Sequence, residues 1–537
     1  MTSNTVVIWG RTMTRFIDKS SGTKLTIAGL LAIQLAACGG GGGTSPASAA
    51  PAVLSTQVTS TTSTNNSQSG SGTNGDSSAG SGNVSSENYV APPPPSGPYV
   101  TATVVVSKAS PGETINSNFL GLSYEKFTVS TRLLTSANTP LVNYLNKLGP
   151  GIIRIGGDSV NHTTWNASGA GKTTGFVAPA DVDRIATLLA ATGWKVIYGL
   201  NHISNSPANI ASEAKYVADK FGDSLIGFEI GNEPDLYYEN GYRPSTYTFS
   251  DFMGEWQAYY NAILAVVPHA QITGPASSNN YKGYTVPFAQ NKGSEVNMVT
   301  QHYYRADGQS ASSTMDLLLT ADPKLPIELQ KINAAAKAAS IPMGYRIDEA
   351  NSFYYGGSST VSPAYGTALW ILDFLFINAE NGCSGVNMHG GGNASYSPIV
   401  DNGSISLAAR PEYYGMLMFS MAANGTVLTT ETTVSTINFT SHAVAQNDGS
   451  TMVLLNNKDT TTSAYATINL NQSASTAVLT TLTGTNLNST SGYTLNGTTV
   501  SNEGLWSPGV PNKVSVDTNG TLTIVVPPMS AILVHAS

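Results

Sequence analysis

Two glutamates occupy positions from which a pair of carboxylates could act on one substrate. Glu233 is the middle residue of an Asn-Glu-Pro tripeptide in an apolar run at residues 226–235, and Glu349 lies in a similar run at residues 343–352. Each follows a predicted strand where that strand opens into its loop. A facing acid and carboxylate, about 5 to 5.5 Å apart, hydrolyse glycosidic bonds with retention of configuration. The alternative is that both glutamates cap helices or form structural ion pairs.

A repeat of strands and helices would position these glutamates. Apolar runs that turn polar or glycine-rich alternate with amphipathic patterns at residues 179–192, 250–266 and 327–339. This alternation predicts parallel strands with right-handed crossovers, and eight units predict a closed (β/α)8 barrel with Glu233 and Glu349 on opposite sides of its mouth. The eight runs are residues 119–125, 151–159, 195–203, 226–235, 271–278, 297–304, 343–352 and 385–392.

The predicted fold class is α/β, with the (β/α)8 barrel at residues 119–415 and a smaller all-β domain after it. From residue 416 to 537, short alternating strands are separated by Asn, Gly, Ser and Thr, which predicts an antiparallel β-sandwich. Residues 99–118 have the same character, and we expect them to add a strand to the sandwich.

The first 38 residues predict an export signal. Basic residues precede an apolar run at residues 25–37 that is too short to span a bilayer. The run ends in Leu-Ala-Ala-Cys38, which resembles the lipobox of bacterial lipoproteins, although an ordinary signal peptide with a chance cysteine is an alternative. The Ser-, Thr- and Gly-rich residues 39–98 predict a disordered tether. We expect an exported protein, lipid-anchored through Cys38 at the bacterial cell envelope.

Composition narrows the choice of partners. The net charge of −8 argues against nucleic-acid binding, and the seven histidines show no metal-ligand spacing, so neither a metal nor another cofactor is predicted. With Cys38 in the anchor, Cys383 has no partner for a disulfide bond. The expected partners are a carbohydrate substrate and, through the lipid alone, the membrane, and we expect a monomer.

Five motifs together carry a resemblance to a known family. They are Phe-Leu-Gly-Leu-Ser-Tyr-Glu at 119–125, Arg-Ile-Gly-Gly-Asp-Ser at 154–159, Glu-Ile-Gly-Asn-Glu-Pro-Asp-Leu-Tyr at 229–237, His-Tyr-Tyr at 302–304 and His-Gly-Gly-Gly at 389–392. From about residue 99 to the C-terminus, the chain resembles glycoside hydrolase family 79, which contains β-glucuronidases and heparanases. The resemblance implies a barrel with a β-sandwich, Glu233 as acid/base, Glu349 as nucleophile, and net retention.

The neighbours of the two glutamates have predicted physical roles. Tyr303 and Arg154 are expected to donate hydrogen bonds to Glu349 and keep it ionised, although Arg154 could instead form a structural ion pair. Asp348 is expected to point away, because adjacent strand residues face opposite sides. The charge on Glu349 would in turn raise the pKa of Glu233.

Several residues are candidates for contact with the sugar. Asn232 is expected to hydrogen-bond the 2-hydroxyl. By the resemblance, the loop after strand seven binds the carboxylate of a uronic acid, which points to Tyr354 and Gly356, although this could be an ordinary loop with an exposed tyrosine pair. The resemblance also implies sugar contacts for Glu125, Asp158 and Tyr396.

These predictions favour an exo-acting β-glucuronidase. A heparanase-like activity on sulfated polymers is less favoured, because the barrel segment contains no run of Lys and Arg. The same barrel and glutamate pair also serve β-xylosidases, arabinofuranosidases and glucanases. A non-catalytic, glycan-binding surface lipoprotein is a further alternative.

Overall fold

The computed structural model describes residues 89–109, 111–401, 403 and 406–537. The predicted signal segment with Cys38 and most of the predicted tether lie outside the described residues, so both stay predictions. Within the described part of the chain, no helix is long and apolar enough to cross a membrane.

Eight parallel strands close into a barrel, as predicted, in the order β10-β11-β2-β3-β6-β7-β8-β9. Each strand lies within one residue of a predicted apolar run. Buried aliphatic side chains fill these strands, and their polar ends meet at one rim. The strands are β2 (Leu120–Glu125), β3 (Ile152–Gly156), β6 (Lys195–Leu200), β7 (Leu225–Ile230), β8 (Ile272–Ser277), β9 (Met298–Tyr304), β10 (Tyr345–Asn351) and β11 (Val386–Gly390).

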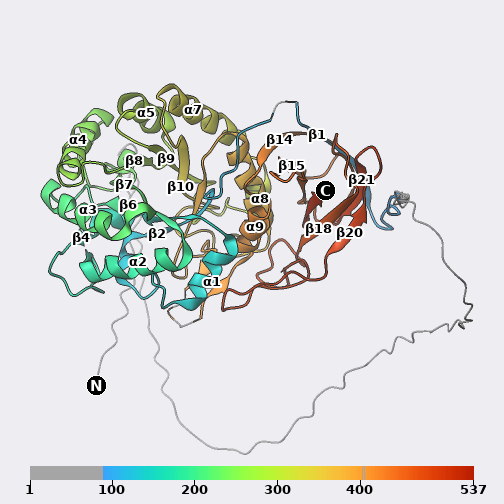
Figure 1. The fold of residues 1–537 in the computed structure, drawn as a ribbon, viewed down its shortest axis with the longest axis horizontal. Helices are drawn as coiled ribbons and strands as arrows, with labels where there is room; N and C mark the ends of the chain where they lie inside the picture. Colours follow the sequence, from blue (N-terminus) through green and yellow to red (C-terminus); the bar gives the residue numbers. More distant parts are fainter. Residues whose placement is uncertain (1–88, 110, 402, 404–405) are drawn as a thin grey trace, which may run out of the picture. The chain divides into compact units, whose positions relative to one another are not determined.

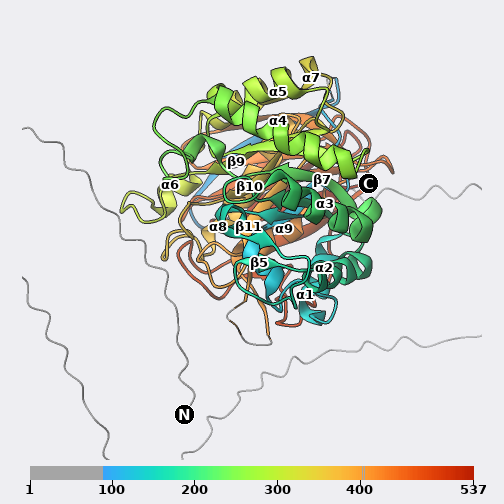
Figure 2. The ribbon, with the colours of Figure 1, turned by 90° about the vertical axis from the view of Figure 1, so that its left-hand side faces the viewer.

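Helices surround the barrel strands, as Figure 2 shows. Polar side chains at Asn138, Ser206 and Thr248 accept hydrogen bonds from the first turns of α1, α3 and α4, which fixes where these helices begin. The helices are α1 (Thr139–Leu148), α2 (Pro179–Thr192), α3 (Pro207–Phe221), α4 (Phe249–Val266), α5 (Val286–Lys292), α6 (Met315–Leu319), α7 (Leu325–Ala338), α8 (Gly366–Glu380) and α9 (Pro411–Ser420).

Short elements occupy the connections between barrel strands and helices. Those at the carboxyl ends of the strands form the rim on which a barrel enzyme carries its chemistry. They include η1 (Lys126–Ser130), η2 (Asp158–His162), β4 (Thr164–Trp165), β5 (Phe176–Val177), η4 (Pro234–Leu236), η5 (Tyr281–Thr285), β12 (Ile399–Val400) and β13 (Ala408–Ala409), whereas η3 (Gly222–Ser224) leads into β7.

The C-terminal region forms a second, ten-stranded sheet. Strand β1 joins it as predicted, antiparallel to β14 and parallel to β17. Side chains from β1, β16, β17 and β22 share one hydrophobic core although these strands are not all neighbours, so the sheet folds over that core. The strands are β1 (Tyr99–Ser107), β14 (Thr426–Val434), β15 (Phe439–Ala445), β16 (Thr451–Asn457), β17 (Ser463–Asn469), β18 (Thr476–Thr483), β19 (Thr494–Leu495), β20 (Asn512–Ser515), β21 (Thr521–Val526) and β22 (Ser530–Ala536).

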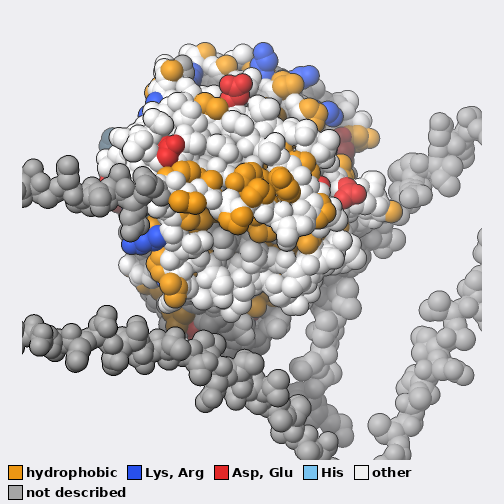
Figure 3. Space-filling model, turned by 90° about the vertical axis from the view of Figure 1, so that its right-hand side faces the viewer, with side chains coloured by type: hydrophobic (Ala, Val, Ile, Leu, Met, Phe, Trp, Pro, Cys, Tyr) orange, Lys and Arg blue, Asp and Glu red, His pale blue; other side chains and the backbone are white. Residues whose placement is uncertain are grey.

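Helices α8 and α9 lie between the barrel and this sheet (Figure 1). Both are apolar nearly all round, and their side chains share a core with barrel residues and with Val444, Leu454 and Leu533 of the sheet. The face of the molecule on the side of the sheet carries mostly uncharged side chains, with a small group of hydrophobic ones near its centre (Figure 3).

Candidate active site

Arg154 of β3 is fully buried and contacts Glu229, Asn232 and Glu349 at the barrel mouth. Its Nη1 donates to Oε2 of Glu349 over 2.5 Å, as expected, and its Nη2 donates to Oδ1 of Asn232 over 2.9 Å. The structural ion pair that was the alternative is also present, because Nε donates to Oε2 of Glu229 over 2.9 Å. Arg154 therefore connects the strand carrying Glu233 to the strand carrying Glu349.

Glu349 lies near the end of β10 among hydrogen-bond donors and positive charge. The hydroxyl of Tyr304 donates to its Oε1 over 2.8 Å, and Nδ1 of His389 lies 3.6 Å from its Oε2. Burial opposes ionisation, but His389, His302 and Arg154, together with the bond from Tyr304, hold the pKa of Glu349 well below its usual range. Glu349 is therefore a carboxylate at neutral pH.

The prediction that Tyr303 donates to Glu349 is wrong, because Tyr304 makes that bond. Tyr303 faces the opposite side of β9, where its hydroxyl donates to Oδ2 of Asp322 over 3.1 Å and its ring stacks on Phe374. Consecutive strand residues alternate between faces, so the choice between two adjacent tyrosines depends on the register of the strand.

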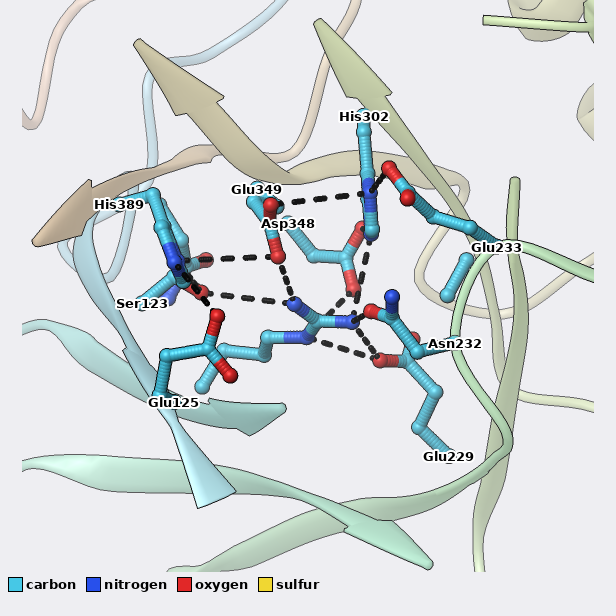
Figure 4. Close-up of polar contacts among 12 residues, drawn as sticks. Ser123, Glu125, Glu229, Asn232, Glu233, His302, Asp348, Glu349 and His389 are labelled. Atoms are coloured by element: carbon cyan, nitrogen blue, oxygen red, sulfur yellow. Dashed lines mark hydrogen bonds and ion pairs between the residues drawn. The ribbon is translucent and has the colours of Figure 1, made fainter. Parts of the chain in front are cut away.

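Asp348 also differs from its prediction, because its side chain turns inward beside that of Glu349 (Figure 4). In the pairing of β9 with β10, Ile347 lies opposite Gln301 and Glu349 lies opposite the next residue, so Asp348 is an extra residue in the ladder. A bulge of this kind breaks the alternation of faces. Oδ2 of Asp348 consequently lies 3.3 Å from Nε of Arg154.

Asp348 and Glu229 form a buried pair of carboxyl groups. Neither oxygen of Asp348 accepts a hydrogen bond from an N–H or O–H group of the described residues. Burial and the neighbouring Glu229 raise the pKa of Asp348 well above its usual range. Burial also opposes the charge on Glu229, but Arg154 lowers the pKa of Glu229 overall. Of this pair, Asp348 is therefore the group that keeps its proton.

Glu233 is the third residue after Ile230, the last residue of β7. Its backbone is in the left-handed conformation, with φ of 50°. Its backbone N–H donates to the carbonyl of Ala276 over 2.8 Å, which fixes the turn against β8. Burial and the negative charges of Glu349 and Asp235 raise the pKa of Glu233. Glu233 thus has the environment of a proton donor, in contrast to Glu349.

His302 lies between the two glutamates and was not among the predicted site residues. Its Nδ1 is 2.9 Å from Oε1 of Glu233, and its Nε2 is 3.3 Å from Nη2 of Arg154. Arg154 presents only N–H groups, so Nε2 of a neutral His302 accepts from it and the ring hydrogen is on Nδ1, facing Glu233. A charged His302 carries a hydrogen on Nδ1 as well. Burial opposes the charge on His302, but Glu349 and Glu233 raise its pKa to about 9.

The two glutamates approach each other closely across His302. One oxygen of Glu233, one oxygen of Glu349 and a ring nitrogen of His302 all lie within 4.8 Å of one another. In the part of the chain that the structure describes, this is also the one group with the spacing to hold a metal ion. For chemistry on a sugar, the important quantity is the short separation of the two carboxyl groups.

The remaining predicted sugar contacts surround this centre. Oε2 of Glu125 accepts from the backbone N–H of Ser159 over 2.9 Å, and Oε1 of Glu125 lies 3.6 Å from Nε2 of His389. Tyr396 is buried, with its ring centre 6.2 Å from that of Tyr304. Asp158 lies farther out on η2, where its Oδ1 accepts from a tyrosine hydroxyl over 3.0 Å.

The loop after β10 brings Tyr354 to the edge of the site. Tyr354 is 38% exposed, and its ring centre lies 6.4 Å from that of Tyr304. Gly356 and Gly357 follow with φ of 82° and 88°, a backbone conformation that favours glycine. The space beside Gly356 is open, whereas Ser362 and Tyr396 pack against Gly357. The carbonyl of Gly356 accepts from the N–H of Tyr396 over 3.3 Å, which joins this loop to the one after β11.

Four residues of the centre were not predicted, namely Glu229, His302, Tyr304 and His389. All four belong to the motifs that carried the family resemblance, and all lie in barrel strands, Glu229 in β7, His302 and Tyr304 in β9, and His389 in β11. Glu229 is a charged residue inside an otherwise apolar strand, and a buried charge of this kind requires a partner. That signal could have identified it.

No family model matches the chain. Among curated proteins, the chain is 26% identical over 259 residues to a β-glucuronidase of Aspergillus niger, covering 43% of this chain and 48% of that protein. It is 24% identical over 331 residues to a β-glucuronidase of Neurospora crassa (52% and 58%), and 23% identical over 261 residues to heparanase of Mus musculus (46% and 47%). The chain thus spans about half the length of the curated relatives that it matches.

Two solved structures illustrate the similarity of fold. A 4-O-α-L-rhamnosyl-β-D-glucuronidase of Fusarium oxysporum superimposes with a TM-score of 0.66 and 21% identity, covering 81% of this chain and 100% of that one. A GH51 arabinofuranosidase of Xanthomonas axonopodis pv. citri gives a TM-score of 0.61 and 15% identity, covering 82% and 100%.

The fold defines the class, a closed (β/α)8 barrel with a second domain built on a ten-stranded sheet. Within that class, the comparisons with known proteins confirm the resemblance to β-glucuronidases and heparanases.

Proposed function

We propose that the protein is a retaining, exo-acting β-glucuronidase that releases terminal glucuronic acid from glycans or glucuronides. The observation that carries the proposal is the Glu233–Glu349 pair, whose nearest oxygens lie within 4.8 Å and whose pKa values shift in opposite directions. This separation fits a retaining enzyme, because inverting enzymes hold their carboxyl groups about 6.5 to 9.5 Å apart. The similarity to two β-glucuronidases supports the choice of sugar.

The reaction has two steps. In the first, Glu233 gives its proton to the glycosidic oxygen while Glu349 bonds to the anomeric carbon, so that the aglycone leaves as an alcohol and the sugar becomes an ester of Glu349. In the second, the Glu233 carboxylate takes a proton from water, whose oxygen displaces Glu349. The two inversions give net retention and restore both groups to their starting states.

The surrounding residues support each protonation state. Arg154 and Tyr304 hold Glu349 as a carboxylate, so it is ready to attack. His302 donates from Nδ1 to Glu233, which steadies that carboxylate after it has given up its proton. Because Oδ1 of Asn232 is occupied by Arg154, its amide N–H groups are the ones left to bind a sugar hydroxyl.

Recognition of the uronic acid is assigned to the loop after β10. The Tyr354 hydroxyl and the backbone N–H groups near Gly356 would donate to the carboxylate at C5. Tyr354→Phe removes one such donor and keeps the ring. A hydrogen bond to a charged group contributes about 1.5 to 3 kcal/mol, so we expect kcat/KM for nitrophenyl β-glucuronide to fall roughly ten- to a hundredfold. The matching β-glucoside has no carboxylate and is the control, since an equal fall for both would exclude this role.

Exo action and envelope attachment complete the proposal. The net charge of −8 suits a single acidic sugar better than a sulfated polymer. Cys38 would carry the lipid, and Cys38→Ala is expected to release the protein from the membrane fraction without changing its specific activity. Membrane association that persists in this variant would exclude anchoring at Cys38.

A panel of nitrophenyl glycosides tests the function as a whole. The purified protein is expected to prefer the β-glucuronide over the β-xyloside, β-glucoside and α-arabinofuranoside, and proton NMR is expected to show the β-anomer released first. A preference for one of the other sugars would exclude the glucuronidase assignment and leave the mechanism standing. Release of the inverted anomer would exclude Glu349 as a nucleophile.

A further inference from the structure

A bulge in β8 contacts the turn that carries Glu233. Between Gly274 and Ser277, β8 holds one residue more than the facing stretch of β9. Within this bulge, Ala276 has φ of 54°, a left-handed conformation that is unfavourable for a residue with a Cβ atom. Bulges beside active sites change the direction in which the groups of a strand point. The directions of the Ala276 peptide groups are therefore the feature to explain.

Both backbone groups of Ala276 are bound by residues of the candidate site or next to it. Its carbonyl accepts from the backbone N–H of Glu233 over 2.8 Å. Its own N–H donates to the side-chain hydroxyl of Thr300 over 3.0 Å. Thr300 lies in β9, two residues before His302, and is fully buried. A side chain of β9 is thus connected through one residue of β8 to the backbone of the proton donor.

The direction of the Thr300 hydroxyl is set by a second bond. The hydroxyl donates to Oε1 of Glu229 over 2.8 Å, and Oε2 of Glu229 accepts from Arg154 over 2.9 Å. An ionised carboxylate only accepts, so the single hydroxyl hydrogen points to Glu229 and a lone pair faces the N–H of Ala276. Removal of the hydroxyl would leave two buried groups without this partner, which is costly.

The placement of Glu233 is sensitive because proton transfer requires close geometry. A displacement of about 1 Å at a reacting group can lower a rate roughly a hundredfold. The N–H and hydroxyl of Ser278 hold the same loop by donating to Asp235 over 2.9 and 2.7 Å. Those bonds act two residues beyond Glu233, whereas the bond to Ala276 acts on Glu233 itself.

We propose that Thr300 is a positioning residue for the proton donor. Its hydroxyl holds the Ala276 peptide in the bulge, and the Ala276 carbonyl holds the backbone of Glu233 where its carboxyl group reaches the glycosidic oxygen. This inference rests on the proposed function and assigns a further residue to its acid step. Thr300 also contacts Glu229 and, through it, Arg154, so an effect on the nucleophile is the alternative that the experiment must separate.

The dependence of the rate on the leaving group separates these two routes. Methyl β-glucuronide has a poor leaving group that must be protonated, whereas dinitrophenyl β-glucuronide needs almost no proton. Thr300→Val removes the hydroxyl and keeps the size of the side chain. We expect its kcat/KM for the methyl glycoside to fall roughly ten- to a hundredfold more than that for the dinitrophenyl glycoside. An equal fall for both would assign the effect to the nucleophile and overturn the proposal.

Two control variants accompany this measurement. Thr300→Ser keeps the hydroxyl and should keep the wild-type ratio of the two kcat/KM values. Thr273→Val removes another fully buried hydroxyl of the barrel, one that donates to the carbonyl of Phe228 over 3.4 Å, and it should keep that ratio as well. If Thr273→Val lowered the ratio as much as Thr300→Val, the effect would not be specific to Thr300 and the proposal would fail.

Urea unfolding shows whether each variant is folded. If Thr300→Val does not fold, Thr300→Cys takes its place, because a thiol is a weaker donor and acceptor than a hydroxyl. Thr300→Cys should lower the ratio in the same direction by a smaller factor, and an unchanged ratio in this folded variant would overturn the proposal.

A double variant tests whether Thr300 acts through Glu233. In Glu233→Ala the proton donor is absent, so the ratio is already low, and adding Thr300→Val should lower it no further. A further fall as large as in the wild-type background would show that Thr300 acts independently of Glu233, which would exclude the proposed role.

The outcomes also separate this inference from the proposed function. If the wild type hydrolyses neither glucuronide, the glucuronidase assignment fails and the role of Thr300 fails with it. If the wild type hydrolyses both and Thr300→Val keeps the wild-type ratio, the glucuronidase assignment stands and Thr300 does not position the proton donor.

Discussion

Two clusters of charged residues in the described part of the chain, one at the barrel mouth and one beside the C-terminal sheet, differ in how their charges are balanced. At the junction of α8 with the C-terminal sheet, Asp373 and Glu380 face His442 and Lys458. Lys458 donates to Asp373 over 2.5 Å, His442 lies 2.6 Å from Glu380, and Asn456 also donates to Asp373 over 2.8 Å. Two anions meet two potential cations, and each anion accepts hydrogen bonds. Such a cluster fixes two domains to each other.

At the mouth of the barrel, carboxyl groups outnumber the cations beside them. Glu229, Asp348 and Glu349 contact Arg154, and Glu233 contacts His302. A cluster with too few cations cannot ionise all its acids, so its protons are divided unequally. Where anions and cations are equal in number, the cluster holds two domains together. Where acids are in excess, one acid keeps its proton beside an ionised carboxylate, and the proposed reaction requires that arrangement.

The largest expected effect separates activity from stability at the barrel mouth. Glu349→Ala should lower kcat by at least about 10⁴-fold, because the covalent step loses its nucleophile. Its stability should change little, since it also removes one of the crowded acids. Activity assays and urea unfolding measure the two effects.

Chemical rescue is the control for that variant. Azide should partly restore turnover of an activated glucuronide, with the opposite anomeric configuration in the product, because the space left by the carboxylate admits an anion on the same face. A large loss of stability of the variant in urea unfolding would mean that Glu349 is a structural residue, as Asp373 is.

The opposite pattern is expected for Asp373→Asn. Removing this charge leaves Lys458 and His442 buried without their common partner, and breaking a buried ion pair destabilises proteins by about 3 to 5 kcal/mol. The kcat per folded molecule should stay near wild type, because these partners lie on the sheet. Asp219→Asn, at an exposed pair with Lys215, is the matched control and should change stability by less than about 1 kcal/mol.

His442 should make the junction sensitive to pH. Burial opposes its charge, but Glu380 and Asp373 raise its pKa to about 9, from an ordinary value of 6.5. The raised pKa of His442 adds to the free energy of unfolding. This contribution is fully present below about pH 6.5 and is lost as the pH rises through 9. It amounts to about 3 kcal/mol.

Unfolding curves of the wild type and His442→Gln between pH 6 and 10 measure this contribution. His302 titrates in the same range, so only the difference between the two proteins isolates His442. The difference should shrink toward pH 10, and a constant difference would show that His442 is neutral in the folded protein.

The barrel and the positions of Glu233 and Glu349 could be predicted because both depend on local pattern. Apolar runs define strands, and strand ends meet at one rim whatever the details of packing. The errors at Tyr303 and Asp348 have a different origin. Which face a strand residue occupies depends on register, and the bulge at Asp348 is set by pairing with β9, which local sequence does not encode.

The smallest expected effect tests how protons are divided at the barrel mouth. Asparagine has nearly the shape of a protonated aspartic acid, so Asp348→Asn should lower neither stability nor kcat/KM appreciably at neutral pH. Burial and Glu229 raise the pKa of Asp348. The contribution of Asp348 to the free energy of unfolding of the wild type is therefore fully present below about pH 4 and declines as the pH rises. The variant should therefore gain stability relative to the wild type as the pH increases from 4 toward 8.

Glu229→Gln is the matched comparison, and it should destabilise the fold strongly, since it removes the carboxylate that accepts from Arg154 over 2.9 Å. If the two variants were equally damaging, the proton would not reside on Asp348, and the barrel mouth would resemble the balanced junction.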